Sequence, residues 1–214
     1  MLSNIMLKLP SCGSVSLRYM RRINFGIRQF IICQEMSFGN FLKFCKLSPS
    51  TEIRLIAQQD LDLLKANLPS APYREHRDDL ADQNAGIVSM AIAWLAGLPI
   101  GKGLIHWSGP RNPIPLEKLG PIPEIFHLYV RRELRSLGIG MHLVQFLEHL
   151  ARSRGHASIG LGVSLNNTKA RTFYERIGYT GSGTVYIEAW SYPGKYGEPV
   201  QVREESEFLV KNLT

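Results

Sequence analysis

The sequence predicts a mixed α/β (α+β) domain that is built on a single sheet. The apolar segment 125–130 is typical of a buried strand, and a glycine-containing turn and an amphipathic helical pattern follow it. A second strand, 158–163, is again followed by a helical pattern. Apolar, β-branched and aromatic residues also cluster in five further strand-like segments. We therefore expect one mixed central sheet of about six to seven strands with flanking helices.

The elements around residues 125–178 follow from strand, cap and breaker signals. Before residue 124 we expect, in order, a strand at 52–57, a helix at 60–67, a charged helix at 71–84 and a hairpin of strands 87–95 and 100–107 around 96–99. The segment 108–123 contains five prolines and is expected to be a loop. After residue 179 we expect two strands, 184–190 and 207–213, separated by a turn-rich stretch.

The turn 135–140 has the features of a phosphate-binding site. Gly138 and Gly140 let backbone approach a phosphate without side-chain collision, and the helix that follows begins with unpaired N–H groups. The positive end of the helix dipole favours an anion, and Arg135 adds a full charge. A short turn of this kind is also often purely structural. A dinucleotide-binding motif is disfavoured, because Leu143 stands where its third glycine is needed.

A second block follows the strand 158–163. Asn166 and Asn167 signal the start of a helix, and Gly178 is placed to cap its end. The apolar stripe of this helix consists of Ala170, Phe173, Tyr174 and Ile177.

Together the two blocks resemble the GNAT superfamily of N-acetyltransferases, whose usual pattern is L-x-V-x-P-x-x-R-G-x-G-I-G followed by L-x-V-x-x-x-N-x-x-A-x-x-x-Y-x-x-x-G-F. The matching positions are Leu128, Val130, Arg135, Gly138, Ile139 and Gly140 in the first block, and Leu161, Val163, Asn167, Ala170, Tyr174, Gly178 and Tyr179 in the second. The departures are Arg132 for a proline, Leu134 for an aromatic residue and Ser136 for a glycine. The strong resemblance covers residues 124–180, and a looser one covers 51–213.

The resemblance implies a central parallel pair of strands that splay apart and hold the pantetheine arm of acetyl-coenzyme A (acetyl-CoA) in the gap. It further implies direct transfer of an acetyl group from this cosubstrate to a primary amine. Carried over position by position, the cofactor-binding residues are Leu128, Val130, Arg135, Ser136, Leu137, Gly138, Ile139, Gly140, Met141, Asn167 and Tyr174. Asn167 is also explained as a helix cap alone.

The resemblance also places a catalytic acid at Tyr174, near the sulfur of the cosubstrate. An alkylammonium with a pKa of about 10.4 must lose a proton before it can attack, and the departing thiolate must gain one. Glu124 and His127 are the candidate bases, at the start of and within the strand before the turn. Each of these three residues also has a structural explanation: Tyr174 as part of a core stripe, and the other two as ordinary strand residues.

The acceptor is a small molecule or a peptide, and the segments that would shape its site, 70–84, 107–123 and 190–203, carry no motif. The charge run from Arg74 to Asp79 is most simply a solvated helix face. A non-catalytic acyl-CoA-binding or regulatory module with the same fold is the alternative function, and a homodimer is left open.

Composition supports one folded domain, 51–214, after a basic extension, 1–50. The chain has 214 residues, is 44% hydrophobic and has a net charge of +7. Residues 1–50 hold seven Lys or Arg and one acidic residue, which leaves +1 for the rest. The folded part therefore has no basic footprint for nucleic acid.

All three cysteines, Cys12, Cys33 and Cys45, lie in the extension, so we expect no metal site and no thiol nucleophile in the domain. Residues 1–34 contain no acid and resemble a transit peptide; alternatively the product begins at Met36, or the stretch is a disordered tail. No apolar run approaches about 18 residues, so we expect no membrane span and a cytoplasmic location.

Overall fold

The computed structural model describes residues 17–18, 35–36, 51–70, 74–194 and 198–214. The chain divides into two units, Met1–Ser50 and Thr51–Thr214. In the first unit, β1 (Leu17–Arg18) and β2 (Glu35–Met36) form an antiparallel pair. The three cysteines lie outside the described residues, and the interpretation of this unit as a disordered or transit-like extension stays a prediction.

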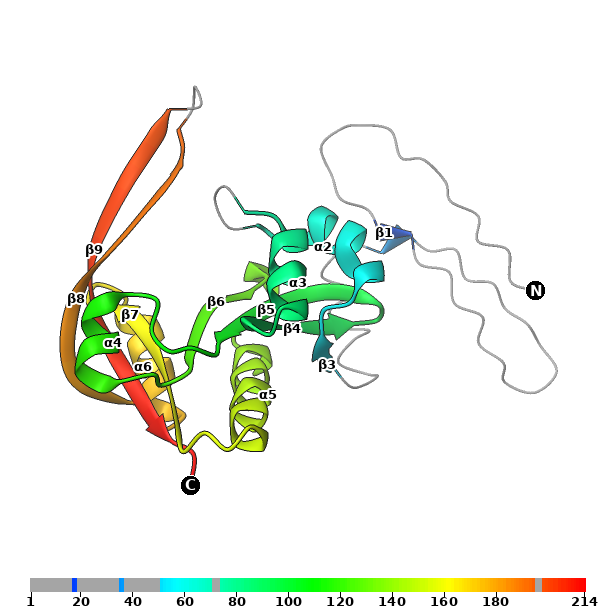
Figure 1. Cartoon of the computed structure of the whole chain (residues 1–214). Helices are drawn as coiled ribbons and strands as arrows, with labels where there is room; N and C mark the ends of the chain where they lie inside the picture. Colours follow the sequence, from blue (N-terminus) through cyan, green and yellow to red (C-terminus); the bar gives the residue numbers. More distant parts are fainter. Residues whose placement is uncertain (1–16, 19–34, 37–50, 71–73, 195–197) are drawn as a thin grey trace. The chain divides into compact units, whose positions relative to one another are not determined.

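The second unit is built on a seven-stranded sheet in the order β3-β4-β5-β6-β7-β9-β8, which is shown in Figure 1. Its strands are β3 (Glu52–Leu55), β4 (Val88–Leu95), β5 (Leu98–His106), β6 (Glu124–Val130), β7 (Ser158–Ser164), β8 (Thr180–Pro193) and β9 (Pro199–Asn212). Only β6 and β7 are parallel neighbours, and every other adjacent pair is antiparallel. The predicted mixed central sheet is therefore confirmed.

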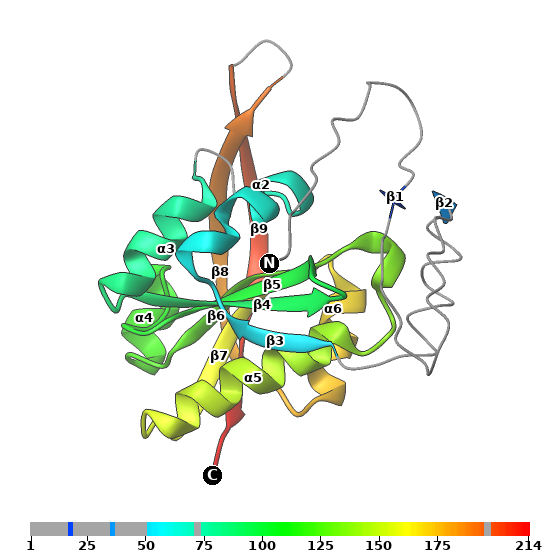
Figure 2. The ribbon, with the colours of Figure 1, turned by 90° about the vertical axis from the view of Figure 1, so that its right-hand side faces the viewer.

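Five α-helices flank this sheet within the described residues of the second unit. They are α2 (Leu61–Asn67), α3 (His76–Asn84), α4 (Pro113–Leu119), α5 (Ile139–Ser153) and α6 (Thr168–Arg176), with the 3-10 turns η1 (Gln58–Asp60) and η2 (Arg132–Leu134). Figure 2 shows α2 and α3 over one face of strands β3 to β5 and α5 over the opposite face. All but α4 fall where the sequence predicts helices.

The core lies on both faces of β4, whose eight residues are all buried. Its even-numbered residues, Val88 to Trp94, pack in a cluster with Leu64 of α2 and Leu80 of α3. Leu143 and Leu147 of α5 are fully buried. The uninterrupted apolar run of β4 is typical of a strand that is covered on both faces.

The hairpin of β4 and β5 has a tighter turn than the sequence predicts. Ala96 and Gly97 both have positive φ, 50° and 79°, as a two-residue turn of the primed type requires. Strand β5 therefore begins at Leu98 and includes Pro99, which pairs with Trp94 beside an irregularity in the ladder. The prediction of a turn over 96–99 is wrong for residues 98 and 99. These residues belong to the strand, although proline usually interrupts one.

The prediction that 108–123 is a loop is wrong, because this segment contains α4. The side chain of Asn112 caps α4 by accepting a hydrogen bond from the backbone N–H of Ile114 at 3.1 Å. Pro113 occupies the first helical position, where the missing N–H has no intrahelical partner to lose. Gly120, with φ of 79°, ends the helix. Prolines in this segment therefore do not only interrupt regular structure, because Pro113 also favours the start of α4.

Strands β8 and β9 are much longer than predicted, at 14 residues each. Their antiparallel pairing runs from Thr180–Val210 to Pro193–Pro199. The hairpin consequently projects beyond the remainder of the sheet, as Figure 1 shows. Much of the stretch that looked turn-rich in the sequence is strand.

A buried ion pair joins α5 to β9. Glu148, which is 2% exposed, accepts hydrogen bonds from Lys211 Nζ at 2.8 and 2.9 Å. Arg152 lies 3.6 Å from the same carboxylate. This pair fixes the last strand of the chain against the long helix that begins at the glycine turn.

We predict that Lys211→Met lowers the free energy of unfolding by about 3 kcal/mol, because it removes both hydrogen bonds of Lys211 to a buried carboxylate and leaves it the longer contact with Arg152. Urea unfolding followed by circular dichroism measures this change. The double variant Glu148→Gln/Lys211→Met, which removes both charges, should recover most of the loss. A single variant as stable as the parent would show that the pair contributes nothing.

Candidate active site

The central feature of the site is a separation between β6 and β7. These parallel strands pair only through Glu124 with Gly160 and Ile125 with Leu161. Beyond these two positions they diverge, as the sequence predicts for the central parallel pair. The gap opens into a cleft of about 750 Å³, lined by residues 124–129 of β6, by 162–164 of β7 and by α6.

A β-bulge in β6 shapes one wall of this cleft. Lys102 of β5 pairs with Tyr129, but Leu104 pairs with Phe126, so Gly103 faces both His127 and Leu128. His127 has φ of 50° at this bulge. A bulge leaves its extra residue out of the ladder and turns its side chain in a new direction. Here both bulged residues line the cleft.

The turn before α5 fits an anionic group. Gly138 is the N-cap residue of α5 with φ of 85°, and a Cβ atom at this position would meet only His142 Cε1, at 3.9 Å. The first intrahelical hydrogen bond runs from the N–H of His142 to the carbonyl of Gly138. The N–H groups of 139–141 therefore have no acceptor within the helix. Open space in front of these donors suits a pyrophosphate.

Arg135 and Ser136 form the exposed rim of this turn. Arg135 Nε donates a hydrogen bond to the carbonyl of Val130 at 3.0 Å, and its guanidinium lies 6.0 Å from the ring centre of Tyr129. Ser136 has φ of 64°, in the left-handed region that favours glycine. The glycine that the GNAT pattern has at this position is thus explained by backbone conformation.

Helix α6 supplies the opposite wall. Asn167 caps this helix by accepting a hydrogen bond from the N–H of Ala170 at 3.1 Å, which confirms its predicted capping role. Asn167 and Tyr174 line the cleft. The ring of Tyr174 packs edge-on against Phe173 and Tyr179, with centroids at 5.0 and 5.8 Å. Burial raises the pKa of Tyr174 to about 12, so the phenol remains protonated at neutral pH.

The two candidate bases differ in their surroundings. Glu124 is 3% exposed and accepts hydrogen bonds from the backbone N–H and the Nε of Arg111, at 2.9 and 3.0 Å. His127 is solvent-accessible within the cleft. Desolvation by the cleft walls, together with the positive charges of Arg111 and Lys102, lowers the pKa of His127 to about 4. Its imidazole is therefore neutral at physiological pH.

Several residues of the cleft carry no sequence motif and were not predicted as site residues. They are Lys102 of β5, Arg111, and Glu188, Trp190 and Glu204 of the β8–β9 hairpin. The signal that pointed toward two of them was indirect: Arg111 and Trp190 come from two of the three unassigned segments that were expected to shape the acceptor site. Glu188 lies on β8 and Glu204 on β9. Only the register between these two strands shows which of their residues face the cleft.

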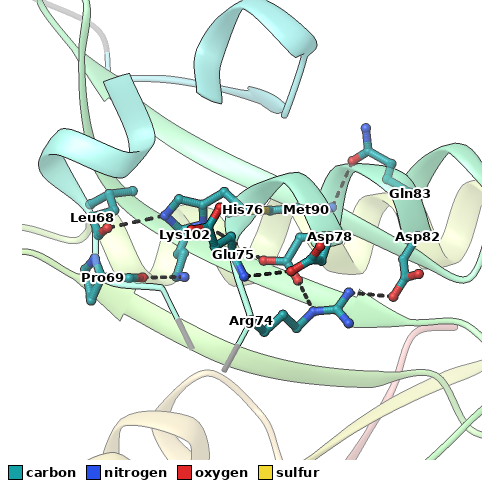
Figure 3. Close-up of polar contacts among 11 residues, drawn as sticks. Leu68, Pro69, Arg74, Glu75, His76, Asp78, Asp82, Gln83, Met90 and Lys102 are labelled. Carbon is teal, nitrogen blue, oxygen red and sulfur yellow. Dashed lines mark hydrogen bonds and ion pairs between the residues drawn. The ribbon is translucent and has the colours of Figure 1, made fainter. Parts of the chain in front are cut away.

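The charge run at the start of α3 is only in part the solvated face that was predicted: Glu75, Arg77 and Asp78 are exposed, but two other residues are not. His76 and Asp79 are each 3% exposed. Arg74 Nε donates a hydrogen bond to Asp79 at 2.7 Å, and Lys102 Nζ donates one to the carbonyl of Pro69 at 2.7 Å. Figure 3 shows Arg74 between the helix and the strand, with Lys102 pointing toward Pro69. Burial lowers the pKa of Lys102.

Comparison with known proteins identifies the family. Residues 53–179, more than half of the chain, match the acetyltransferase (GNAT) family. The chain belongs to the GNAT acetyltransferase family. A 5-NmdU N-acetyltransferase from Pseudomonas phage PaMx11 is 33% identical over 63 residues, which are 29% of this chain and 43% of that protein. This match therefore spans less than half of the relative's length.

Solved structures share the fold of this GNAT chain. An N-acetyltransferase from Staphylococcus aureus Mu50 has a TM-score of 0.55 at 16% identity, covering 78% of this chain and 100% of its own. A ribosomal-protein-alanine N-acetyltransferase from Brucella melitensis has a TM-score of 0.54 at 20% identity, covering 75% and 99%. At such identities the likeness concerns the fold alone.

The described part of the chain lacks a membrane-spanning helix and a cluster of metal-ligating side chains. No helix there is long and apolar enough to cross a membrane. No group of three or more His, Cys, Asp or Glu side chains there is arranged to hold a metal ion.

We predict that Ser136→Gly raises the free energy of unfolding by about 1 kcal/mol, because it removes a side chain from a left-handed backbone position. The matched control is Leu137→Gly at the next exposed position, whose φ is not positive, and it should gain no stability. Thermal and urea unfolding measure both variants. Equal stability changes in the two would contradict the strain at Ser136.

Proposed function

We propose that this GNAT chain transfers an acetyl group from acetyl-CoA directly to a primary amine of a small molecule or a peptide. The observation that carries the proposal is the cleft between β6 and β7, which brings Tyr174, His127 and a set of charged side chains together. Family membership supports acyl transfer, and the empty space before α5 supports a coenzyme that carries phosphate.

The residues that would hold acetyl-CoA are those that the family resemblance indicates. The N–H groups of 139–141, the turn at Gly138 and the charge of Arg135 would receive the pyrophosphate. The backbone of Leu128 and Val130, on the diverging part of β6, would receive the pantetheine arm, and Asn167 would contact it from α6. When bound, the cosubstrate supplies an acyl group activated as a thioester.

In this proposal His127 relays the proton of the acceptor amine to solvent. A neutral imidazole that lines the cleft can accept a proton, directly or through water. With a pKa of about 4 the imidazole is a weak base, so it passes the proton on to water and does not retain the charge. Glu124 has an indirect role in this proposal. Its buried carboxylate accepts hydrogen bonds from Arg111 and thereby positions that side chain.

Tyr174 serves as the acid at the other end of the reaction. Its phenol is protonated at neutral pH and lies on the cleft wall formed by α6. It can therefore donate to the sulfur that becomes anionic as the thioester breaks.

We predict that Tyr174→Phe lowers kcat by about a hundredfold and leaves acetyl-CoA affinity unchanged, because only the hydroxyl is removed. The control is Tyr179→Phe, since the buried Tyr179 hydroxyl has no hydrogen-bond partner among the described residues. Steady-state transfer to an amine and calorimetric titration of the coenzyme measure the two quantities. Unchanged turnover in Tyr174→Phe would remove Tyr174 from the mechanism.

We also predict that Gly138→Trp abolishes acetyl-CoA binding, because an indole would fill the space before α5. The matched control is Gly155→Trp at the other end of α5, where φ is 82° and the space around the Cβ position is also open. Calorimetry should give micromolar binding for the parent and the control. Absence of binding by the folded parent would overturn the proposal, whereas binding without transfer to any amine would favour a non-catalytic acyl-CoA-binding module.

A further inference from the structure

The β8–β9 hairpin presents one of its faces to the cleft. Alternation along β8 places Tyr186, Glu188 and Trp190 on one side, and Glu188 and Trp190 line the cleft. Val185 and Ile187, on either side of Tyr186 in the sequence, are exposed on the other face. The cross-strand partners on the cleft side are Ser206 for Tyr186, Glu204 for Glu188, Val202 for Trp190 and Val200 for Tyr192.

Two acidic residues therefore stand directly opposite each other in the cleft wall. Glu188 and Glu204 are a register pair, and both line the cleft. Like charges in this arrangement destabilise a sheet. Burial and the nearby carboxylates of Glu124 and Glu204 raise the pKa of Glu188, against the opposing effect of Arg111. The fold thus retains an unfavourable pair at a position that faces open space.

The cations of the cleft are held more closely by other partners. Arg111 Nε lies 3.0 Å from Glu124, and its Nη2 forms a longer ion pair, of 3.8 Å, with Glu188. Arg74 forms ion pairs with Asp79 and Asp82 of α3. No ion pair to Glu204 occurs within the described residues. The Glu188–Glu204 pair is consequently the part of the cleft wall where negative charge exceeds positive charge.

An apolar band continues the same face of the hairpin beyond this pair. It consists of Trp190 and Val202, followed by Tyr192 and Val200, in register order. Trp190 and Tyr192 are 39% and 43% exposed. Exposed aromatic side chains next to a carboxylate pair can receive a ligand that has one cationic end and one apolar end.

We propose that the Glu188–Glu204 pair recognises the ammonium group of the acceptor, and that the band from Trp190 to Tyr192 receives its body. The acceptor class is then a primary amine on an apolar or aromatic body with no carboxylate beside the amine. This inference rests on the proposed function, because it assigns the acceptor of the same cleft. A carboxylate near the amine would face the acidic pair and be repelled.

An acceptor series tests the class directly. With acetyl-CoA saturating, 2-phenylethylamine, phenylalanine and ethanolamine differ by one carboxylate and by the apolar body. We expect kcat/KM for 2-phenylethylamine to exceed that for each of the others by about tenfold or more. Equal or better use of phenylalanine would overturn the inference. Trp190→Ala should reduce the preference over ethanolamine, and Val185→Ala, on the outer face of β8, should not.

The acidic pair is tested with Glu204→Gln beside Glu205→Gln, the next residue on β9, which is exposed and faces away from the cleft. Glu204→Gln should raise KM for 2-phenylethylamine about tenfold and leave kcat and acetyl-CoA affinity unchanged. Its unfolding free energy should not fall, because a repulsion is relieved, so the effect cannot come from misfolding. Equal KM values in the two variants would overturn the role of the pair.

A binding measurement separates this inference from the proposed function. Phenylethyl-trimethylammonium carries the charge but cannot be acetylated, and its neutral carbon isostere lacks the charge. Calorimetry should show that the parent binds the cation more tightly than the isostere and that Glu204→Gln loses this difference. If no amine is acetylated but this difference is present, the proposed reaction fails and the ammonium site stands. If the parent binds both compounds equally, the site fails whatever the activity.

Discussion

The arrangement of the site depends on how little of β6 and β7 is paired. Two register positions hold these parallel strands together, after which each needs other hydrogen-bond partners or a ligand. The bulge at His127 lies in the part of β6 that is no longer paired with β7. Helix α6 forms the opposite side of the opening. The cleft thus exists because β6 and β7 are hydrogen-bonded to each other over only part of their length. The core around β4 and α5 must supply the stability that this missing strand pairing does not.

The glycine turn before α5 adds a second cost. Gly138 adopts its left-handed conformation easily, but Ser136 adopts one that is unfavourable for any residue with a Cβ atom. The strain is confined to an exposed rim, while Leu134 and Ile139 on either side are buried and hold the turn in place. A rigid helix end with open space before it is the kind of preorganised donor set that an anion requires.

The charged side chains of the cleft fall into two classes, which differ in how completely a partner of opposite charge neutralises them. Arg111 with Glu124, and Arg74 with Asp79, are close, partly buried pairs that position loops and helix α3. Glu188 and Glu204 instead face each other, and Arg111, at 3.8 Å from Glu188, lies closer to Glu124. The first class explains why Glu124 has a structural task in addition to its candidate catalytic one. The second class is the one to which we assign recognition of the acceptor.

By itself the sequence predicted the mixed sheet, the helix α5 after a glycine turn and the helix α6 with its Asn167 cap, because local spacing and periodicity indicate each of these elements. The residues of the coenzyme site are a prediction from the same segments. Tertiary structure alone decided the cleft wall that the β8–β9 hairpin forms. Glu188 and Glu204 become neighbours only through the register of a hairpin, Arg111 reaches Glu124 across 13 positions, and α4 forms among prolines through one cap. Such contacts depend on strand register and on packing between distant segments, which leave no periodic signal in the chain.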